Sequence, residues 1–251
     1  SERRTEMNYR FSQWFFVSGL LSLLLVLVLP LAAKDKPLPI SDWGALSNWG
    51  TKRYKFTRVS PQGQKQEDGS LTLETKLTRD GVILKDKFFI EIKGKEVSMD
   101  MTQTCRRDQY LSPTRIESIG KGDDEFQTFK ATIKDGKATI KGERDKVMEI
   151  PEGTVTFFAF FRIVTQLPRE EGATYFCNSS LEGSEMNLKA GFRVNVIGKE
   201  TISYEGASVK CWKISRKGVD QREHFFWVTD EGVLQRVLID GRKQMDLQIG
   251  D

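Results

Sequence analysis

Apolar and polar residues alternate along most of the chain after residue 50, and this alternation limits the fold more than any other feature. Successive side chains of a β-strand point to opposite faces of a sheet, so a period of two indicates strands with one buried face. The pattern is found in the segments 71–78, 88–93, 97–101, 129–133, 138–140, 192–196, 209–214, 225–228, 233–239 and 245–249. No internal repeat of about 20 to 50 residues is present, which excludes solenoids and propellers.

Turn signals that contain glycine separate the predicted strands at short intervals. Asp135 and Gly136 are typical of a two-residue hairpin turn between the segments 129–133 and 138–140. Further turn signals are Gly198-Lys199, Glu205-Gly206, Lys217-Gly218, Asp230-Glu231-Gly232 and Asp240-Gly241. Short strands joined in this way favour a meandering antiparallel sheet. We therefore predict a mainly β protein with few helices, built as a curled antiparallel sheet or half-open β-barrel.

One segment, 153–166, breaks the alternation and predicts a helix. Its apolar residues recur at spacings of three and four, as on one face of a helix. We expect the helix to begin near Thr154 or Thr156 and to end at Pro168, because proline does not continue a helix. The apolar face consists of Phe157, Phe158, Phe160, Phe161, Val164 and Leu167. We place this Phe-rich helix on the concave face of the sheet.

The phenylalanine face has two interpretations. It fills the concave side of the sheet as hydrophobic core, because apolar stripes on helices are usually buried. Alternatively, it lines an apolar cavity between helix and sheet, with a polar mouth, that accepts an acyl chain. The sequence leaves both interpretations open.

An uncharged, leucine-rich segment, 14–31, precedes the predicted sheet. Arg10 lies before it, and Pro30, Ala32 and Ala33 close it, as in a secretory signal peptide. The segment is also just long enough to span a bilayer, so an uncleaved anchor that holds the protein at the membrane is the alternative. We predict a bacterial protein exported to the periplasm or cell envelope.

The chain divides into three parts on these patterns. Residues 1–33 are the predicted signal peptide or N-terminal membrane anchor. Residues 34–50 are a linker with a short helical lead-in. Residues 51–251 form a single β-rich domain.

The charge pattern argues against nucleic-acid binding, and the motif content argues against catalysis. The chain has 39 Lys and Arg against 35 Asp and Glu, and the two signs are interleaved. The single histidine, His224, excludes every metal site or catalytic group that needs two imidazoles. The sequence has no nucleophile elbow, phosphate loop or dinucleotide fingerprint. We therefore predict a non-enzymatic protein without metal or cofactor, in which His224 is structural.

The three cysteines leave two possibilities. In an oxidising compartment an odd count allows one internal disulfide, and Cys177 with Cys211 is the expected pair. Alternatively, Cys105, Cys177 and Cys211 are three buried thiols that act as small apolar side chains.

Several short motifs lie in the second half of the predicted helix and after it. They are Phe161-Arg162 with Leu167-Pro168, Val196-Ile197-Gly198-Lys199-Glu200, Glu205-Gly206, and Trp227-Val228-Thr229-Asp230. With these motifs, residues 112–249 resemble an uncharacterised family of exported bacterial proteins, domain of unknown function 3108. One position departs from the family, which usually has Leu-Pro where this chain has Leu234-Gln235.

Proteins with this layout are similar to LolA/LolB-like lipoprotein carriers, half-open β-barrels that hold acyl chains under helices. The resemblance implies that the helix phenylalanines and the apolar strand faces bind the ligand, and it implies no catalytic residue. The candidate ligand-binding residues are Phe157, Phe158, Phe160, Phe161, Val164, Phe192, Val194 and Phe226.

The sequence thus predicts an exported, non-catalytic protein that binds an apolar ligand, a lipid or a lipoprotein acyl chain, between sheet and helix. The alternative is a structural or protein-interaction module that pairs with a partner through a sheet edge. A third possibility is a hydrolase built on His224 or on a pair of carboxylates, which would need His224 at a cleft beside a Ser, Cys or Asp.

Overall fold

The structure is a computed structural model that describes residues 36–38, 43–59, 65–92, 95–122, 125–143, 145–182, 186–204, 206–241 and 243–248. The predicted leader, 1–33, lies outside the described residues. In the described part, no helix has the length and apolar character needed to cross a membrane.

The described residues form a mainly β unit with two short helices. The strands are β1 (Lys36–Pro37), β2 (Thr51–Val59), β3 (Lys65–Leu77), β4 (Val82–Ile92), β5 (Lys95–Cys105), β6 (Pro113–Gly122), β7 (Glu125–Lys134), β8 (Lys137–Lys141), β9 (Lys146–Glu149), β10 (Thr154–Thr156), β11 (Thr174–Glu182), β12 (Asn187–Tyr204), β13 (Ala207–Gly218), β14 (Glu223–Val228), β15 (Leu234–Ile239) and β16 (Lys243–Leu247). The helices are α2 (Trp43–Ser47) and α3 (Phe157–Ile163), and a 3-10 turn, η1 (Val164–Gln166), continues α3.

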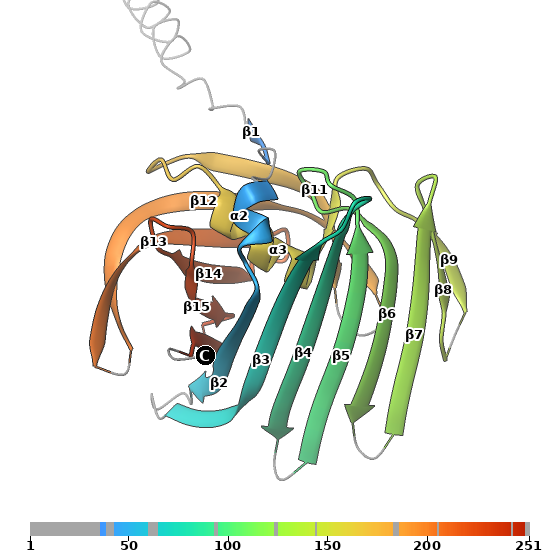
Figure 1. Ribbon diagram of the computed structural model, residues 1–251, viewed down its shortest axis with the longest axis horizontal. Coiled ribbons are helices and arrows are strands. Elements are labelled where there is room, and N and C mark those ends of the chain that lie inside the picture. Colours follow the sequence, from blue (N-terminus) through green and yellow to red (C-terminus); the bar gives the residue numbers. More distant parts are fainter. Residues whose placement is uncertain are drawn as a thin grey trace, which may run out of the picture. The chain divides into compact units, whose positions relative to one another are not determined.

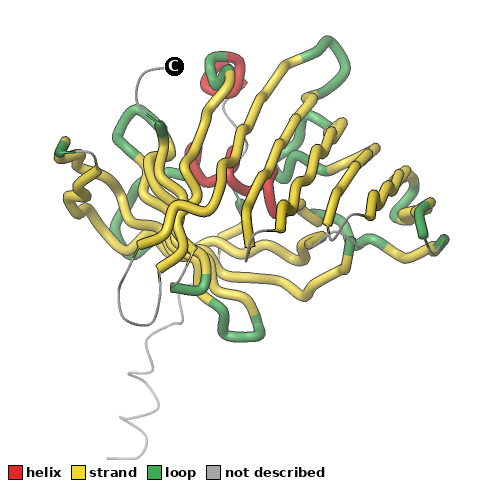
Figure 2. The backbone as a smooth tube through the Cα atoms, turned by 90° about the horizontal axis from the view of Figure 1, so that it is seen from below, coloured by secondary structure: helices red, strands yellow, loops and turns green. Residues whose placement is uncertain are grey.

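All of these strands belong to one curled sheet that does not close on itself. Its order is β1-β11-β12-β13-β14-β15-β16-β2-β3-β4-β5-β6-β7-β8-β9, and β10 adds to β11 in parallel. The last strand, β16, pairs with β2, so the C-terminal strands continue directly into the N-terminal ones. Figure 1 shows the two groups, β3 to β9 from cyan through green to yellow-green and β12 to β15 from orange to red, with α2 and α3 between them. In Figure 2, strands surround a helical segment (red). The predicted fold class is confirmed.

The alternation of the sequence corresponds to the two faces of the sheet. On β3, Leu71 and Leu73 are fully buried, whereas the intervening Thr72 is only partly covered. The predicted hairpin turn joins β7 to β8, and both of its residues, Asp135 and Gly136, have positive φ, as a tight two-residue turn requires.

One predicted turn is wrong. The Gly198-Lys199 signal lies inside β12, a strand of 18 residues that runs through it without a break. The pairing of β12 with β13 shifts register between Val196 and Gly198, and Gly198 has a φ of 150°. Glycine therefore allows a β-bulge here rather than a chain reversal, and the bulge bends the long strand.

Helix α3 begins later than the earlier of its two predicted starts. Residues Thr154 to Thr156 form β10, and Thr156 then caps α3, because its side chain accepts a hydrogen bond from the N–H of Ala159 at 3.2 Å. After η1, Leu167 is extended, and Pro168 follows. Aromatic contacts hold the helix in the core: Phe160 meets Phe192 and Phe226 edge-on, with ring centroids 5.2 and 5.3 Å away.

A buried ion pair also fixes α3 to the sheet. Arg162, in the last turn of α3, and Asp86, on β4, are fully buried, and their Nη1 and Oδ1 atoms are 2.6 Å apart. The remaining N–H groups of Arg162 donate to the Thr75 side chain and to the carbonyls of Glu74 and Phe158. Because every polar branch of Arg162 has a partner, the buried charge is compensated at this position.

A chain of side-chain hydrogen bonds extends from Asp86 to the start of the helix. Gln103 donates to Asp86 Oδ2 at 3.0 Å, and its own Oε1 accepts from the Thr156 hydroxyl at 2.6 Å. Burial raises the pKa of Asp86, and the charge of Arg162 opposes this effect. Both ends of α3 are thus connected to β4 and β5 through polar contacts inside the core.

The expected disulfide does not form. All three cysteines lie among the described residues, and all are free and buried. Cys177 on β11 pairs with Phe192 of β12, and Cys211 on β13 pairs with Glu200 of β12, so a whole strand and eight positions along it separate the two cysteines. This separation exceeds the usual Cα distance of a disulfide. The alternative interpretation, three buried thiols, is confirmed.

The thiols are expected to react slowly in the folded protein. Burial raises the pKa of Cys177 and of Cys211 to about 11, and it raises the pKa of Cys105 as well. Because the thiolate is the reactive form, a thiol-specific reagent such as Ellman's reagent at pH 8 should label the three cysteines only over a long period. In guanidinium chloride all three should react at once. A cysteine that reacts in the native protein at the rate of a free thiol would contradict this expectation.

Candidate ligand-binding cavity

An open cavity of about 1180 Å³ lies beside the start of α3, on the inner face of the sheet. Its volume exceeds the range of about 300–1,000 Å³ that is usual for small-molecule sites. Strands β4 to β8 supply one wall, and β11, β14, β15, β16 and the first residues of α3 supply the other. The cavity therefore lies between helix and sheet, where the second interpretation of the phenylalanine face placed it.

The walls are largely apolar and contain four of the six methionines of the chain. The apolar lining residues are Phe56, Phe88, Ile90, Val97, Met99, Met101, Phe129, Ile140, Phe157, Phe158, Leu181, Met186, Ile239 and Met245. Methionine side chains are flexible and polarisable, so a wall made of them adapts to ligands of different shape. These side chains give the cavity a mostly apolar wall.

A cross-strand row of residues forms the polar side of the cavity. Arg216 on β13 pairs with His224 on β14, His224 pairs with Ile239 on β15, and Ile239 pairs with Lys243 on β16. Directly paired residues project from the same face of a sheet, so the row faces inward together with buried Arg216. His224, Ile239 and Lys243 line the cavity itself.

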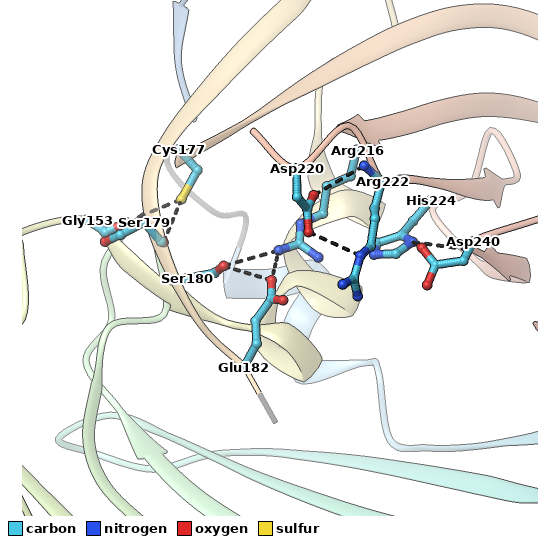
Figure 3. Close-up of polar contacts among 10 residues, drawn as sticks. All are labelled: Gly153, Cys177, Ser179, Ser180, Glu182, Arg216, Asp220, Arg222, His224 and Asp240. Atoms are coloured by element: carbon cyan, nitrogen blue, oxygen red, sulfur yellow. Dashed lines mark hydrogen bonds and ion pairs between the residues drawn. The ribbon is translucent and has the colours of Figure 1, made fainter. Parts of the chain in front are cut away.

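Arg216 lies behind the cavity wall in a compensated environment. Its guanidinium lies 4.1 Å from the ring centroid of Phe192, and it donates to Ser180 Oγ at 3.2 Å and to the carboxylate of Glu182 (Figure 3). Burial raises the pKa of Glu182, but the charge and hydrogen bond of Arg216 outweigh burial, so the pKa is lowered. Glu182 lines the cavity as a paired carboxylate.

His224 contacts both an aromatic ring and a carboxylate. Its ring meets Phe157 edge-on with centroids 6.0 Å apart, and its Nδ1 lies 3.5 Å from Asp240 Oδ1. The backbone N–H of Asp240 donates to the same Nδ1 at 3.4 Å (Figure 3). Burial and the nearby charge of Arg216 lower the pKa of His224. The imidazole is therefore neutral near pH 7, and its proton resides on Nε2.

The predicted site residues separate into two groups. Phe157 and Phe158 line the cavity. The other six pack in the main core and do not reach the cavity wall; they are Phe160, Phe161, Val164, Phe192, Val194 and Phe226. The helix face is thus divided between core and cavity wall, and acceptance of an acyl chain stays a prediction.

Sequence reasoning missed the wall supplied by β4 to β8. Phe88, Met99 and Met101 belong to the alternating segments, so their burial on one face was predicted, but their part in a cavity was not. Met99 and Met101, two flexible side chains on one face of the same predicted strand, were the available signal. Among the described residues, no group of three or more His, Cys, Asp or Glu side chains is arranged to hold a metal ion.

Comparisons with known proteins give two distant structural likenesses. No known protein family matches the chain, and no curated protein matches it. A protein of the DUF1089 family from Pseudomonas aeruginosa is similar with a TM-score of 0.40 and 9% identity, over 65% of this chain and 86% of that one. A protein described as exported, with a YmcC-like fold, from Bacteroides fragilis gives a TM-score of 0.23 and 8% identity, over 78% of this chain and 92% of that one. Neither description names domain of unknown function 3108 or the lipoprotein carriers, so that resemblance stays a prediction.

Proposed function

We propose that this protein is a non-catalytic component of the bacterial cell envelope that binds the hydrocarbon chain of a lipid or of a lipoprotein in the cavity. The observation that carries the proposal is the open cavity of about 1180 Å³ with walls of Phe, Met, Ile, Leu and Val side chains. Apolar surface of this kind is stabilised when a hydrocarbon chain replaces water. The predicted export segment, 14–31, supports a location in the cell envelope, where such ligands occur.

The proposed binding role does not require a reaction. His224 lies at the cavity beside Asp240, but its Nδ1 accepts the backbone N–H of Asp240, and among the described residues no Ser or Cys side chain hydrogen-bonds to the ring. A nucleophile activated by an imidazole needs that hydrogen bond. The contacts of His224 therefore favour a binding or structural role over general-base catalysis.

A matched pair of variants tests the cavity. Phe88 lines it, whereas Phe89, the next residue of β4, faces the other side of the sheet and is 37 % exposed. We expect native mass spectrometry of detergent-free protein from the envelope fraction to show a lipid adduct for the wild type and for Phe89→Glu. In Phe88→Glu the adduct should fall about tenfold or more, because binding would bury an unpaired carboxylate against hydrocarbon.

Organic extraction of the purified protein identifies the bound molecule. A wild-type protein that carries no lipid, even after incubation with membrane vesicles, would contradict the proposal. An adduct that persists equally in Phe88→Glu would place the ligand elsewhere on the protein. If no ligand is found, the interaction module becomes the favoured function, with the outer edge strand β9 as its candidate surface, because Val147 on this strand is 68 % exposed.

A further inference from the structure

Hydrogen-bond donors remain available on the polar side of the cavity. The ring of His224 carries a proton on Nε2, and no acceptor among the described residues bonds to it. Arg222, which also lines the cavity, bonds to Asp220 through Nε at 3.2 Å, which leaves its two Nη groups without a partner in the described part of the chain. The ammonium of Lys243 likewise has no partner among these residues, and its side chain is exposed at the cavity.

The donors on this side outnumber the free acceptors. Glu182 accepts from Arg216 and from the Ser180 hydroxyl. The Asp240 carboxylate lies 3.5 Å from Nδ1 of His224, which carries no proton, so this carboxylate is an acceptor that no donor among the described residues pairs with. The hydrogen bonds that a ligand can complete here are therefore mostly ones in which the protein donates and the ligand accepts.

The donors also have a fixed position relative to the apolar wall. His224 and Lys243 flank Ile239 in the cross-strand row, and Ile239 is part of the apolar lining. Phe157, at the start of α3, contacts His224 directly. A molecule that lies along this wall has its chain against Ile239 and the phenylalanines and its end within reach of Arg222, His224 and Lys243.

We propose that the ligand of the cavity is an anionic amphiphile, whose carboxylate or phosphate group is bound by Arg222, His224 and Lys243 while its hydrocarbon chain lies on the apolar wall. This inference rests on the proposed function and adds the chemical class and the orientation of the ligand. The arginine fork binds planar and tetrahedral oxyanions through paired hydrogen bonds, and Lys243 contributes a second positive charge.

A displacement assay with the purified protein tests binding of the ligand's headgroup separately from binding of its hydrocarbon chain. Nile red, which is uncharged, reports occupation of the cavity, and dodecanoate, dodecyl phosphate and dodecanol compete with it below their micellar concentrations. We expect the two anionic compounds to displace the dye at about one tenth of the concentration needed for dodecanol, or less, because charge-assisted hydrogen bonds add to equal chain burial. Inorganic phosphate alone should displace the dye only at far higher concentration.

Charge-removing variants assign the effect to Arg222 and Lys243, the two charged residues of the three. In Arg222→Gln/Lys243→Gln the anionic compounds should bind only as well as dodecanol, while dodecanol binds as in the wild type, which also shows that the fold is intact. The control Lys210→Gln/Lys217→Gln removes the same charge from exposed positions of β13 outside the cavity and should keep the anionic preference.

The other outcomes are distinguishable. Equal displacement by all three compounds in the wild type would overturn the proposed preference for an anionic headgroup. It would leave the proposed binding of a hydrocarbon chain intact. Failure of every compound, dodecanol included, would overturn the proposed function and this inference together. Inorganic phosphate that competes as strongly as dodecyl phosphate would indicate a free-anion site and overturn the assignment of an amphiphile.

Discussion

Replacement of Arg162 with methionine is expected to destabilise the protein by about 3–5 kcal/mol, the usual cost of removing one partner of a buried ion pair. The side chain is fully buried, and its loss leaves the carboxylate of Asp86 without its opposite charge. The polar contacts to Glu74, Thr75 and Phe158 are lost in the same step. Equilibrium unfolding in guanidinium chloride, followed by tryptophan fluorescence, measures the change in the free energy of unfolding.

Two further variants separate the buried charge from the loss of an arginine as such. Arg162→Met/Asp86→Leu should recover a large part of the lost stability, because no unpaired charge remains in the core. Arg115→Met removes an arginine that pairs with Glu117 at 2.6 Å in solvent and should leave stability nearly unchanged. An Arg162→Met protein as stable as the wild type would contradict the structural role of the pair.

The loss of stability in Arg162→Met should also depend on pH. Burial raises the folded-state pKa of Asp86, and without Arg162 nothing of opposite charge counteracts this. Between the unfolded-state pKa of about 3.9 and the raised folded-state pKa, the folded variant binds more protons than the unfolded chain, so its stability falls as pH rises. The difference in the free energy of unfolding between Arg162→Met and the wild type should therefore be smaller at pH 5 than at pH 8.

Phe161→Ala is expected to cost about 3–5 kcal/mol, because it empties a fully buried position in the main core. The ring meets three others edge-on, those of Phe157, Phe158 and Phe226, with centroids 5.2, 5.8 and 5.6 Å away. These contacts are lost together with the buried area. Thermal unfolding by circular dichroism gives the change in melting temperature.

Phe158→Ala is the matched comparison on the same helix. Phe158 is half-buried and lines the cavity, so its removal enlarges a space that already exists and should cost clearly less stability. The order of the two variants should reverse in the ligand assay. At temperatures where both are folded, Phe158→Ala should lose more ligand binding than Phe161→Ala. Equal losses of stability would contradict the division of the helix face between core and cavity.

Local patterns in the sequence were sufficient for the architecture. Alternation on segments such as 71–78 identified strands because the buried face of a sheet imposes a period of two. The helix was visible because Phe157, Phe160, Phe161 and Val164 recur at helical spacing. The turn at Gly198 was misread because glycine permits both a reversal and a bulge, and only the pairing with β13 distinguishes them.

The site depends on information that no local pattern contains. Arg216, His224 and Lys243 form a row only because three successive hairpins set their registers. Phe88 and Phe157 face one cavity although 69 positions separate them in the chain. In the sequence, Arg162 stood out only as part of the Phe161-Arg162 motif, since burial of an arginine is recognised only when its partner on β4 is in place.

The pairing of β16 with β2 has a consequence for how the protein acquires its structure. These strands lie far apart in the described chain, so the two groups of strands can join only after β16 has been made. Contacts between such distant segments slow folding, because the ends of a long loop must meet before the contact is gained. Until β16 docks, the facing edges of β2 and β15 stay unpaired, and exposed strand edges of this kind can pair with other chains, so slow joining of the two groups leaves the protein open to aggregation during folding.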